Sequence, residues 1–130
     1  MTQTLVSIGS TICLKEVLAV SRSEASVSID PSAVSLIKEA RAFVHGVVAT
    51  PNASPVYGVN TGFGALAEVP VEHENLCQLQ LNLIRSHACG VGEPLSEEVV
   101  RIMLLLRAQV LALGHSGVRL ELVQRLVDFL

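Results

Sequence analysis

Aromatic and charged side chains are scarce in this 130-residue sequence. It has no tryptophan, one tyrosine and three phenylalanines, which together make up 3% of the chain. Charged residues make up 16%, against roughly 25% in typical soluble domains, while 50% of the residues are hydrophobic. A small chain with so few charges has little polar material to cover its surface, so we expect much of that surface to be buried against other protein.

Basic clusters and paired cysteines are absent too. The nine Lys and Arg residues are scattered and the formal net charge is −3, so the electrostatics favour neither nucleic acid nor an anionic membrane as a partner. The three cysteines, Cys13, Cys77 and Cys89, include no Cys-x-x-Cys pair. This spacing argues against a disulfide framework and against a zinc site. We therefore expect no metal and a reducing, cytoplasmic setting.

Targeting and membrane-spanning segments are not evident either. The N-terminus has no basic start, and Lys15 and Glu16 interrupt its only apolar stretch, so no signal peptide is predicted. The most apolar segment, residues 99–113, contains Arg101 and Arg107 and is too short to span a bilayer. We therefore expect no membrane among the partners.

Two short segments near the N-terminus, residues 4–8 and 25–29, alternate apolar with small polar residues. Such alternation predicts short strands, and the two are expected to pair as a small ribbon. Between them, Ser10 or Thr11 is predicted to cap a short helix that ends near Ser21.

Helical periodicity dominates the rest of the chain. Asp30-Pro31 is a strong helix start, with Asp as the N-cap and Pro at the first helical position. Gly90 and Gly92 are expected to stop a helix, and Ser96 to cap the next one. The four predicted helices cover residues 31–49, about 71–89, 97–113, and the segment that begins at Ser116 or Gly117. The predicted fold is mainly α, with one minor strand pair near the N-terminus.

The run Tyr57-Gly58-Val59-Asn60-Thr61-Gly62-Phe63-Gly64 lies between two of these helices and holds the only tyrosine. It lacks the Gly-Lys-Ser/Thr of a Walker loop and the glycine spacing of a Rossmann fingerprint. It is either an ordinary turn or a flexible loop that presents Tyr57. A tyrosine has an ordinary pKa of about 10, so a catalytic tyrosine base needs neighbours that stabilise its phenolate.

His87 is the second candidate residue. It shares a predicted helix face with Leu76, Leu79 and Leu83, so one interpretation is a core histidine with one ring nitrogen hydrogen-bonded. Its position three residues before Gly90 favours a functional role, because a helix end can open onto a cavity. The residues alone leave both interpretations open.

Three blocks of this sequence resemble the histidine and aromatic amino acid ammonia-lyases. Residues 57–64 match the tyrosine loop of that family at every position. Ser86-His87-Ala88, with the Gly-Val-Gly and Glu93-Pro94 that follow, matches a second block, and residues 114–119 resemble a third. The resemblance covers residues 30 to 130 and implies the N-terminal part of the helical ammonia-lyase (L-aspartase-like) fold.

The resemblance implies a single N-terminal segment of such a lyase. Its expected parts are short strands and a helix in about 1–30, a helix and linker in 31–56, the tyrosine loop in 57–70, and helices in 71–130. The lyases form their electrophile, a methylideneimidazolone, from an internal Ala-Ser-Gly, but here neither Ala25-Ser26 nor Ala53-Ser54 is followed by glycine. In the family that tripeptide lies a little downstream of position 130. We therefore expect a fragment that contains no cofactor of its own and is inactive alone.

The implied reaction of the full-length enzyme, a homotetramer, is the elimination of ammonia from L-histidine to give trans-urocanate. The resemblance assigns Tyr57 to the base side of this reaction and His87 to binding of the substrate side chain. Gly58, Gly62 and Gly64 would provide the loop flexibility that closure over the site needs.

Two alternatives stay open. Lyases and aminomutases that act on tyrosine also use a histidine at this position for the phenol hydroxyl, so a tyrosine or phenylalanine ammonia-lyase or aminomutase of the same family is the first. The second is a truncated, non-catalytic helical module that only associates with other chains.

Overall fold

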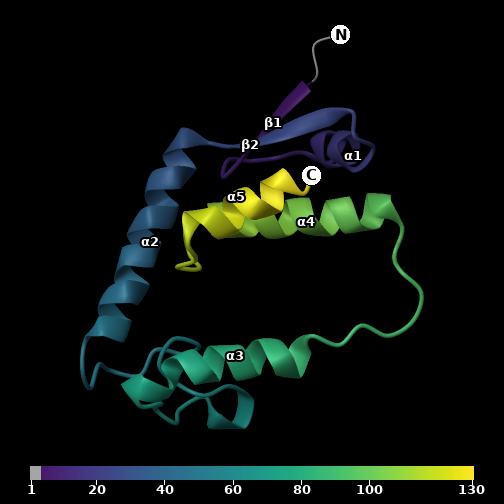
Figure 1. Ribbon diagram of the computed structural model, residues 1–130. Coiled ribbons are helices and arrows are strands. Elements are labelled where there is room, and N and C mark those ends of the chain that lie inside the picture. Colours follow the sequence, from purple (N-terminus) through teal and green to yellow (C-terminus); the bar gives the residue numbers. More distant parts are fainter. Residues whose placement is uncertain (1–3) are drawn as a thin grey trace. The chain divides into compact units, whose positions relative to one another are not determined.

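The structure, a computed structural model, describes residues 4–130 and groups them into two compact units. One unit contains the described residues up to Ala42 together with Pro94–Leu130, and the other contains Phe43–Glu93. Helices dominate, and the one sheet in the described part of the chain has two strands (Figure 1). The mainly α fold with a minor strand pair is therefore confirmed.

The first unit begins with two short strands, β1 (Thr4–Ile8) and β2 (Ala25–Ile29). They pair in parallel, with Val6 opposite Val27. Parallel neighbours need a crossover connection, and α1 (Leu14–Ser21) lies within it. The predicted pairing is confirmed, and the intervening helix accounts for its direction.

The helix α1 begins later than predicted. Its N-cap is Cys13, whose backbone N–H donates a hydrogen bond to Glu16 Oε2 at 2.7 Å, so the expected caps, Ser10 and Thr11, were wrong. The Ser10 hydroxyl instead donates to the Ser7 carbonyl at 3.1 Å. The Glu16 carboxylate in the first turn thus accepts from the backbone N–H of the N-cap residue, as the acidic residue of a capping box does. The hydrogen bond from the Cys13 backbone holds the pKa of the Glu16 carboxyl below its ordinary value.

The helix α2 (Pro31–Ala49) has the bounds that the sequence predicts. The Asp30 carboxylate caps it by accepting hydrogen bonds from the Ser32 hydroxyl and, at 2.8 Å, from the Ser32 backbone N–H. These two bonds favour the ionised form, so they lower the pKa of the Asp30 carboxyl. Ala33 and Ile37 are the buried residues of this helix.

Two further helices, α4 (Glu97–Ala112) and α5 (Leu120–Asp128), complete the first unit. The helix α4 contacts α1, α5 and β1, and α5 also contacts β2 (Figure 1). Every helix and strand of this unit contributes to one apolar core. Its buried members are Val6, Ile8, Val17, Val20, Ala25, Ala33, Ile37, Leu105, Ala108, Leu111, Ala112 and Val123.

The bounds of α4 agree closely with the prediction, but α5 starts later. Ser96 is the N-cap of α4, as expected, and its C-cap is Leu113. The prediction that the last helix begins at Ser116 or Gly117 was wrong. Gly117 has left-handed backbone (φ +63°), which a right-handed helix does not accommodate, so the helix starts only after Arg119.

Side chains of α4 hold the N-terminal segment through its backbone. Gln109 Oε1 accepts a hydrogen bond from the Gly9 N–H at 2.9 Å, and Gln109 Nε2 donates to the Ser10 carbonyl at 2.7 Å. Arg101 Nε donates to the Val20 carbonyl at 2.9 Å, at the end of α1. These bonds fix α4 against both ends of the segment that joins the two strands.

The second unit contains the end of α2, the glycine-rich run and α3 (Leu76–His87). A short 3₁₀ turn, His73–Asn75, precedes α3, so the helix begins later than the predicted start near Val71. Residues 70 and 71 instead pair with the loop, since Pro70 bridges Thr61 and the Val71 N–H donates to the Asn60 carbonyl at 2.9 Å. The helix also ends before the glycines that were expected to stop it.

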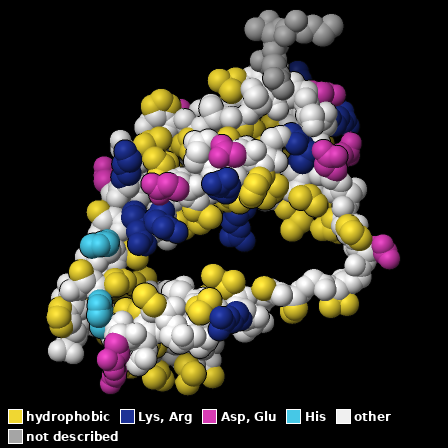
Figure 2. Space-filling view, viewed as in Figure 1, with side chains coloured by type: hydrophobic (Ala, Val, Ile, Leu, Met, Phe, Trp, Pro, Cys, Tyr) yellow, Lys and Arg dark blue, Asp and Glu magenta, His cyan; other side chains and the backbone are white. Residues whose placement is uncertain are grey.

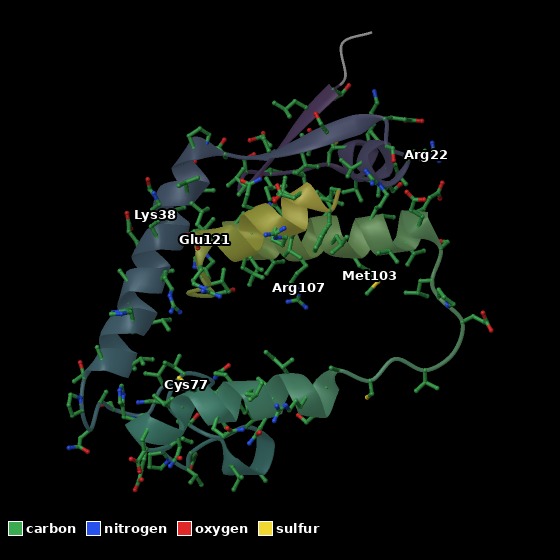
Figure 3. All side chains as sticks on the ribbon, in the orientation of Figure 1. Arg22, Lys38, Cys77, Met103, Arg107 and Glu121 are labelled. Atoms are coloured by element: carbon green, nitrogen blue, oxygen red, sulfur yellow. The ribbon has the colours of Figure 1, made fainter. Side chains whose placement is uncertain are left out.

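Apolar side chains remain at the surface of both units (Figure 2). On α4 they follow helical spacing along one stripe: Val99, Met103, Leu106, Val110 and Leu113. Met103 and Arg107 project from α4 on the side away from the strands (Figure 3). Within residues 4–130, no helix has the length and apolar character that crossing a membrane requires.

Gly114, just after α4, lies where no side chain fits. Its φ is +77°, and a Cβ there would come within 2.6 Å of Leu36 Cβ on α2. Gly46 is the opposite case, because it is helical and a Cβ there would meet no atom within 4 Å. The two glycines therefore form a matched pair for substitution by alanine.

Gly114→Ala is expected to lower the free energy of unfolding by about 2–4 kcal/mol, because left-handed backbone and the clash with Leu36 both oppose a Cβ. Gly46→Ala should raise it by about 0.5–1 kcal/mol, because alanine favours a helix interior. Urea unfolding of the two variants and the unsubstituted chain, at one protein concentration, measures both. A Gly114→Ala variant at least as stable as the unsubstituted chain would show that the close approach of α2 to Gly114 is wrong.

The Asp30 cap predicts how stability depends on pH. The pKa of its carboxyl is lower in the folded chain than in the unfolded chain, so its contribution is fully present above the ordinary Asp pKa of about 3.9. The contribution disappears as pH falls through the folded pKa. Asn at this position can still accept the Ser32 N–H but does not titrate, so Asp30→Asn should show a shallower loss of stability in acid. Urea midpoints measured from neutral to acidic pH for both chains test this, and parallel curves would contradict it.

Candidate functional site

Tyr57 lies on the surface of the second unit. The residue is 65% exposed, and its ring and the Phe63 ring form a T-shaped contact, with centroids 6.1 Å apart and an interplanar angle of 75°. This contact holds the tyrosine ring from one side and leaves the phenol accessible. The structure therefore places the one tyrosine at the surface of this unit.

The glycine-rich run is closed by backbone hydrogen bonds with the segment that follows it. Thr61 and Pro70 form an isolated antiparallel bridge, and the Gly62 N–H donates to the Val69 carbonyl at 3.0 Å. A 3₁₀ turn, Gly64–Leu66, lies between the two sides. Thr61 is almost fully buried. The run is thus a loop whose two sides are joined by backbone hydrogen bonds.

Asn60 supplies the side chain that organises this loop. Its Oδ1 accepts a hydrogen bond from the Val56 N–H at 2.6 Å, and its Nδ2 donates to the Ser54 carbonyl at 3.2 Å and to the Ala53 carbonyl at 3.4 Å. Only 9% of the residue is exposed. The amide therefore ties Asn60 to three residues that precede Tyr57, Ala53, Ser54 and Val56.

The three glycines of the run are required for different conformational reasons. Gly58 (φ +75°) and Gly64 (φ +57°) have left-handed backbone. A Cβ at Gly62 would come within 2.7 Å of Leu66 Cβ and of the Leu66 carbonyl oxygen. Each glycine is thus needed for the observed conformation of the loop. The expectation that these glycines also let the loop move stays a prediction.

His87 is the last residue of α3, and its side chain is exposed. Its Nδ1 lies 2.9 Å from the Leu83 carbonyl oxygen and 3.0 Å from Ser86 Oγ. In the described chain the imidazole is therefore tied to the helix end at one nitrogen and open at the other. It is not packed in the core, which was one of the two interpretations of the sequence.

Tyr57 and His87 belong to the same unit but do not share its cleft. A cleft of about 530 Å³ opens in this unit, and neither of them lines it. The lining residues are Val47, Val48, Thr50, Pro51, Asn52, Ala53, Asn60, Pro70, Val71, Glu72, His73 and Leu76. Among residues 4–130, no group of three or more His, Cys, Asp and Glu side chains is placed to bind a metal ion.

The sequence model of the aromatic amino acid lyases matches residues 12–130. The chain belongs to the aromatic amino acid lyase family. It is 48% identical to a histidine ammonia-lyase of Myxococcus xanthus over 122 residues, which are 94% of this chain and 24% of that protein. A histidine ammonia-lyase of Symbiobacterium thermophilum is also 48% identical, over 125 residues. This chain thus spans about a quarter of the length of the curated relatives it matches.

Solved structures of the family have the same fold over this quarter. A tyrosine aminomutase from Streptomyces globisporus matches 97% of the lyase chain with a TM-score of 0.87 at 31% identity, covering 24% of that structure. A histidine ammonia-lyase from Trypanosoma cruzi matches 96% of it with a TM-score of 0.78 at 41% identity, again covering 24% of the structure. The ammonia-lyase fold implied by the resemblance is confirmed.

The methylideneimidazolone implied by the family does not fit the residues of this lyase chain. Such a group needs an Ala-Ser-Gly sequence, and none occurs in these 130 residues. Ala53 and Ser54, the nearest match in the second unit, are followed by Pro55, and their carbonyls accept hydrogen bonds from Asn60. These residues therefore support the loop.

Asn60 was not singled out by the sequence analysis as a residue with a role of its own. The signal was present, because Asn and Thr inside a glycine-rich run are residues whose side chains bond to nearby backbone. What the sequence does not specify is which backbone groups they reach. The structure shows that Asn60 binds toward the N-terminus, at residues 53, 54 and 56.

Asn60→Ala is expected to open the loop locally, because it leaves the Val56 N–H and two carbonyls without their side-chain partner. Hydrogen exchange at the Val71 N–H, which donates to the Asn60 carbonyl, should accelerate by at least about tenfold, or 1.4 kcal/mol. Asn75→Ala is the matched control, since Asn75 is exposed and its side chain makes no capping bond. Equal exchange rates in the two variants would show that the amide does not hold the loop.

Proposed function

We propose that this chain is the part of a histidine ammonia-lyase that carries its tyrosine loop. The reaction is the elimination of ammonia from L-histidine to give trans-urocanate. The observation that carries the proposal is the exposed phenol of Tyr57 on a loop held by Asn60, in a chain about half identical to curated histidine ammonia-lyases. The enzyme is proposed to be a cytoplasmic homotetramer, and the exposed apolar stripe of α4 is consistent with association.

Tyr57 is assigned to the removal of the substrate β-proton. This proton is barely acidic, so the reaction needs a positioned base together with a group that turns the amine into a leaving group. The second group would come from an Ala-Ser-Gly sequence, which these 130 residues lack. This chain therefore supplies the base side of the reaction and is inactive alone. Loop closure over the substrate would bring the phenol to the β-carbon.

His87 is assigned to the substrate side chain. An exposed imidazole at the end of α3 has one nitrogen that is not used by the helix, and this nitrogen can pair with a polar ring. A site built around such a group disfavours a bare phenyl ring, because the nitrogen is then left without a partner. His87 thus favours histidine over phenylalanine as the substrate.

A tyrosine lyase or aminomutase is the second candidate. The observation in its favour is the structural match to the Streptomyces globisporus tyrosine aminomutase, whose TM-score of 0.87 exceeds that of the Trypanosoma cruzi histidine ammonia-lyase. The sequence identities run the other way, at 31% against 41%. Identity reflects side chains more directly than backbone similarity does, so histidine is the preferred substrate. A non-catalytic association module is the remaining alternative.

The deciding variant is Tyr57→Phe in an enzyme that carries this segment. It keeps the ring contact with Phe63 and removes only the hydroxyl, so the fold should be intact while turnover of L-histidine is nearly abolished. Phe63→Leu is the control, because it loosens the ring contact but keeps the phenol. The measurement is the rate of urocanate formation, with circular dichroism to verify folding.

A Tyr57→Phe enzyme that keeps more than about a tenth of its kcat has lost under ~1.4 kcal/mol of barrier stabilisation, and Tyr57 would then be a packing residue. Comparing L-histidine with L-tyrosine in the unsubstituted enzyme separates the two candidate substrates. No turnover of any aromatic amino acid would favour the association module.

A further inference from the structure

Three polar atoms meet at the end of α3. Ser86 Oγ lies 2.9 Å from the Leu83 carbonyl oxygen, His87 Nδ1 lies 2.9 Å from the same oxygen, and Nδ1 and Oγ are 3.0 Å apart. All three distances are those of hydrogen bonds. The arrangement is therefore a closed triangle, and each bond must have one donor and one acceptor.

The donors in this triangle can be assigned from chemistry alone. A carbonyl oxygen only accepts, so in the bond between Ser86 and Leu83 the hydroxyl must be the donor. The hydroxyl has one hydrogen, so only its lone pairs are left to face Nδ1. Nδ1 then faces two acceptors. Only a protonated Nδ1 satisfies both contacts, because a bare Nδ1 would set its lone pair against the Leu83 oxygen at 2.9 Å. The C-terminal end of α3 carries the negative end of the helix dipole, which also favours an N–H over a lone pair at Nδ1.

We propose that Ser86 and the Leu83 carbonyl hold neutral His87 as the Nδ1–H tautomer, so that Nε2 faces outward as a hydrogen-bond acceptor. Ser86 is a positioning residue in this arrangement. The proposal rests on the substrate contact assigned to His87 above and specifies its polarity. The ring that binds there carries an N–H or O–H donor, as imidazole and phenol do, and a ring with only an acceptor is rejected.

The tautomer can be measured without any catalysis. Two-bond ¹⁵N–¹H spectra of the uniformly labelled chain distinguish protonated from bare ring nitrogens, at a pH well above the ordinary histidine value of about 6.5. We expect a protonated Nδ1 and a bare Nε2 for His87, with its signals identified by their loss in His87→Gln. A His87 that is protonated mainly at Nε2 would overturn the proposal.

Ser86 is tested by two substitutions. Ser86→Ala removes one of the two acceptors that face Nδ1, so the population of the Nε2–H tautomer should rise by about threefold to tenfold. Ser86→Thr keeps the hydroxyl and should retain the original ratio, while circular dichroism verifies the helix in both. An unchanged ratio in Ser86→Ala would remove Ser86 from the proposal.

The polarity of the site is tested by substrate choice in an enzyme that carries this segment. L-3-(4-pyridyl)alanine has the shape of phenylalanine but presents only an acceptor at the far edge of its ring. The ratio of kcat/KM for pyridylalanine to that for phenylalanine is measured in the unsubstituted enzyme and in His87→Leu, so that the intrinsic reactivities cancel. We expect this ratio to rise by about threefold to tenfold in His87→Leu, because the opposed lone pairs are removed.

A ratio that falls or stays unchanged in His87→Leu would show that His87 does not present an acceptor to the substrate ring. The spectroscopic and kinetic tests separate two kinds of failure. The Nδ1–H tautomer with no lyase activity would sink the proposed function alone. Activity with the Nε2–H tautomer would sink only the inference about the triangle.

Discussion

The glycine-rich loop depends on one buried amide. Asn60 bonds to backbone groups before Tyr57 through its side chain, and to Val71 after the loop through its own carbonyl. It therefore joins the entry and the exit of the loop at a single residue. The loop is held by the Asn60 side chain and by backbone hydrogen bonds. The exposed phenol of Tyr57 is therefore not needed to hold the loop together. The residue proposed to react, Tyr57, and the residue that supports the loop, Asn60, thus have only two residues between them in the sequence.

The sequence predicted the elements of this fold well where local signals agreed. Asp30-Pro31 and Ser96 mark the starts of α2 and α4 at the expected residues, and at α2 the Asp30 carboxylate makes the capping bond. It failed where a distant group competed for the same backbone. Ser10 was a plausible cap, but its carbonyl and hydroxyl are bound by Gln109 and Ser7. The predicted helix began near Val71, but the Val71 N–H donates to the Asn60 carbonyl, and this residue pairs with the loop.

The candidate site was found from the sequence by its motifs and not by its geometry. Tyr57 and His87 follow from the resemblance, while the roles of their neighbours follow only from coordinates. The triangle formed by Ser86, His87 and Leu83 is an example. Its residues are three and four apart, as helix neighbours must be, yet spacing alone does not say which atoms donate. The coordinates show which atoms lie within hydrogen-bonding distance, and the donor or acceptor capacity of each atom then assigns the roles.

The two bonds of Gln109 to Gly9 and Ser10 join positions about one hundred residues apart. Contacts this distant in the chain are slow to form, because a long loop must close before they contribute any stability. During synthesis, β1 leaves the ribosome well before its partner on α4 exists. The strands, α1 and the start of α2 must wait with an incomplete core until Pro94–Leu130 has been made, whereas Phe43–Glu93 is continuous in sequence. The unit that carries the tyrosine loop is therefore synthesised whole before the core of the other unit can be completed.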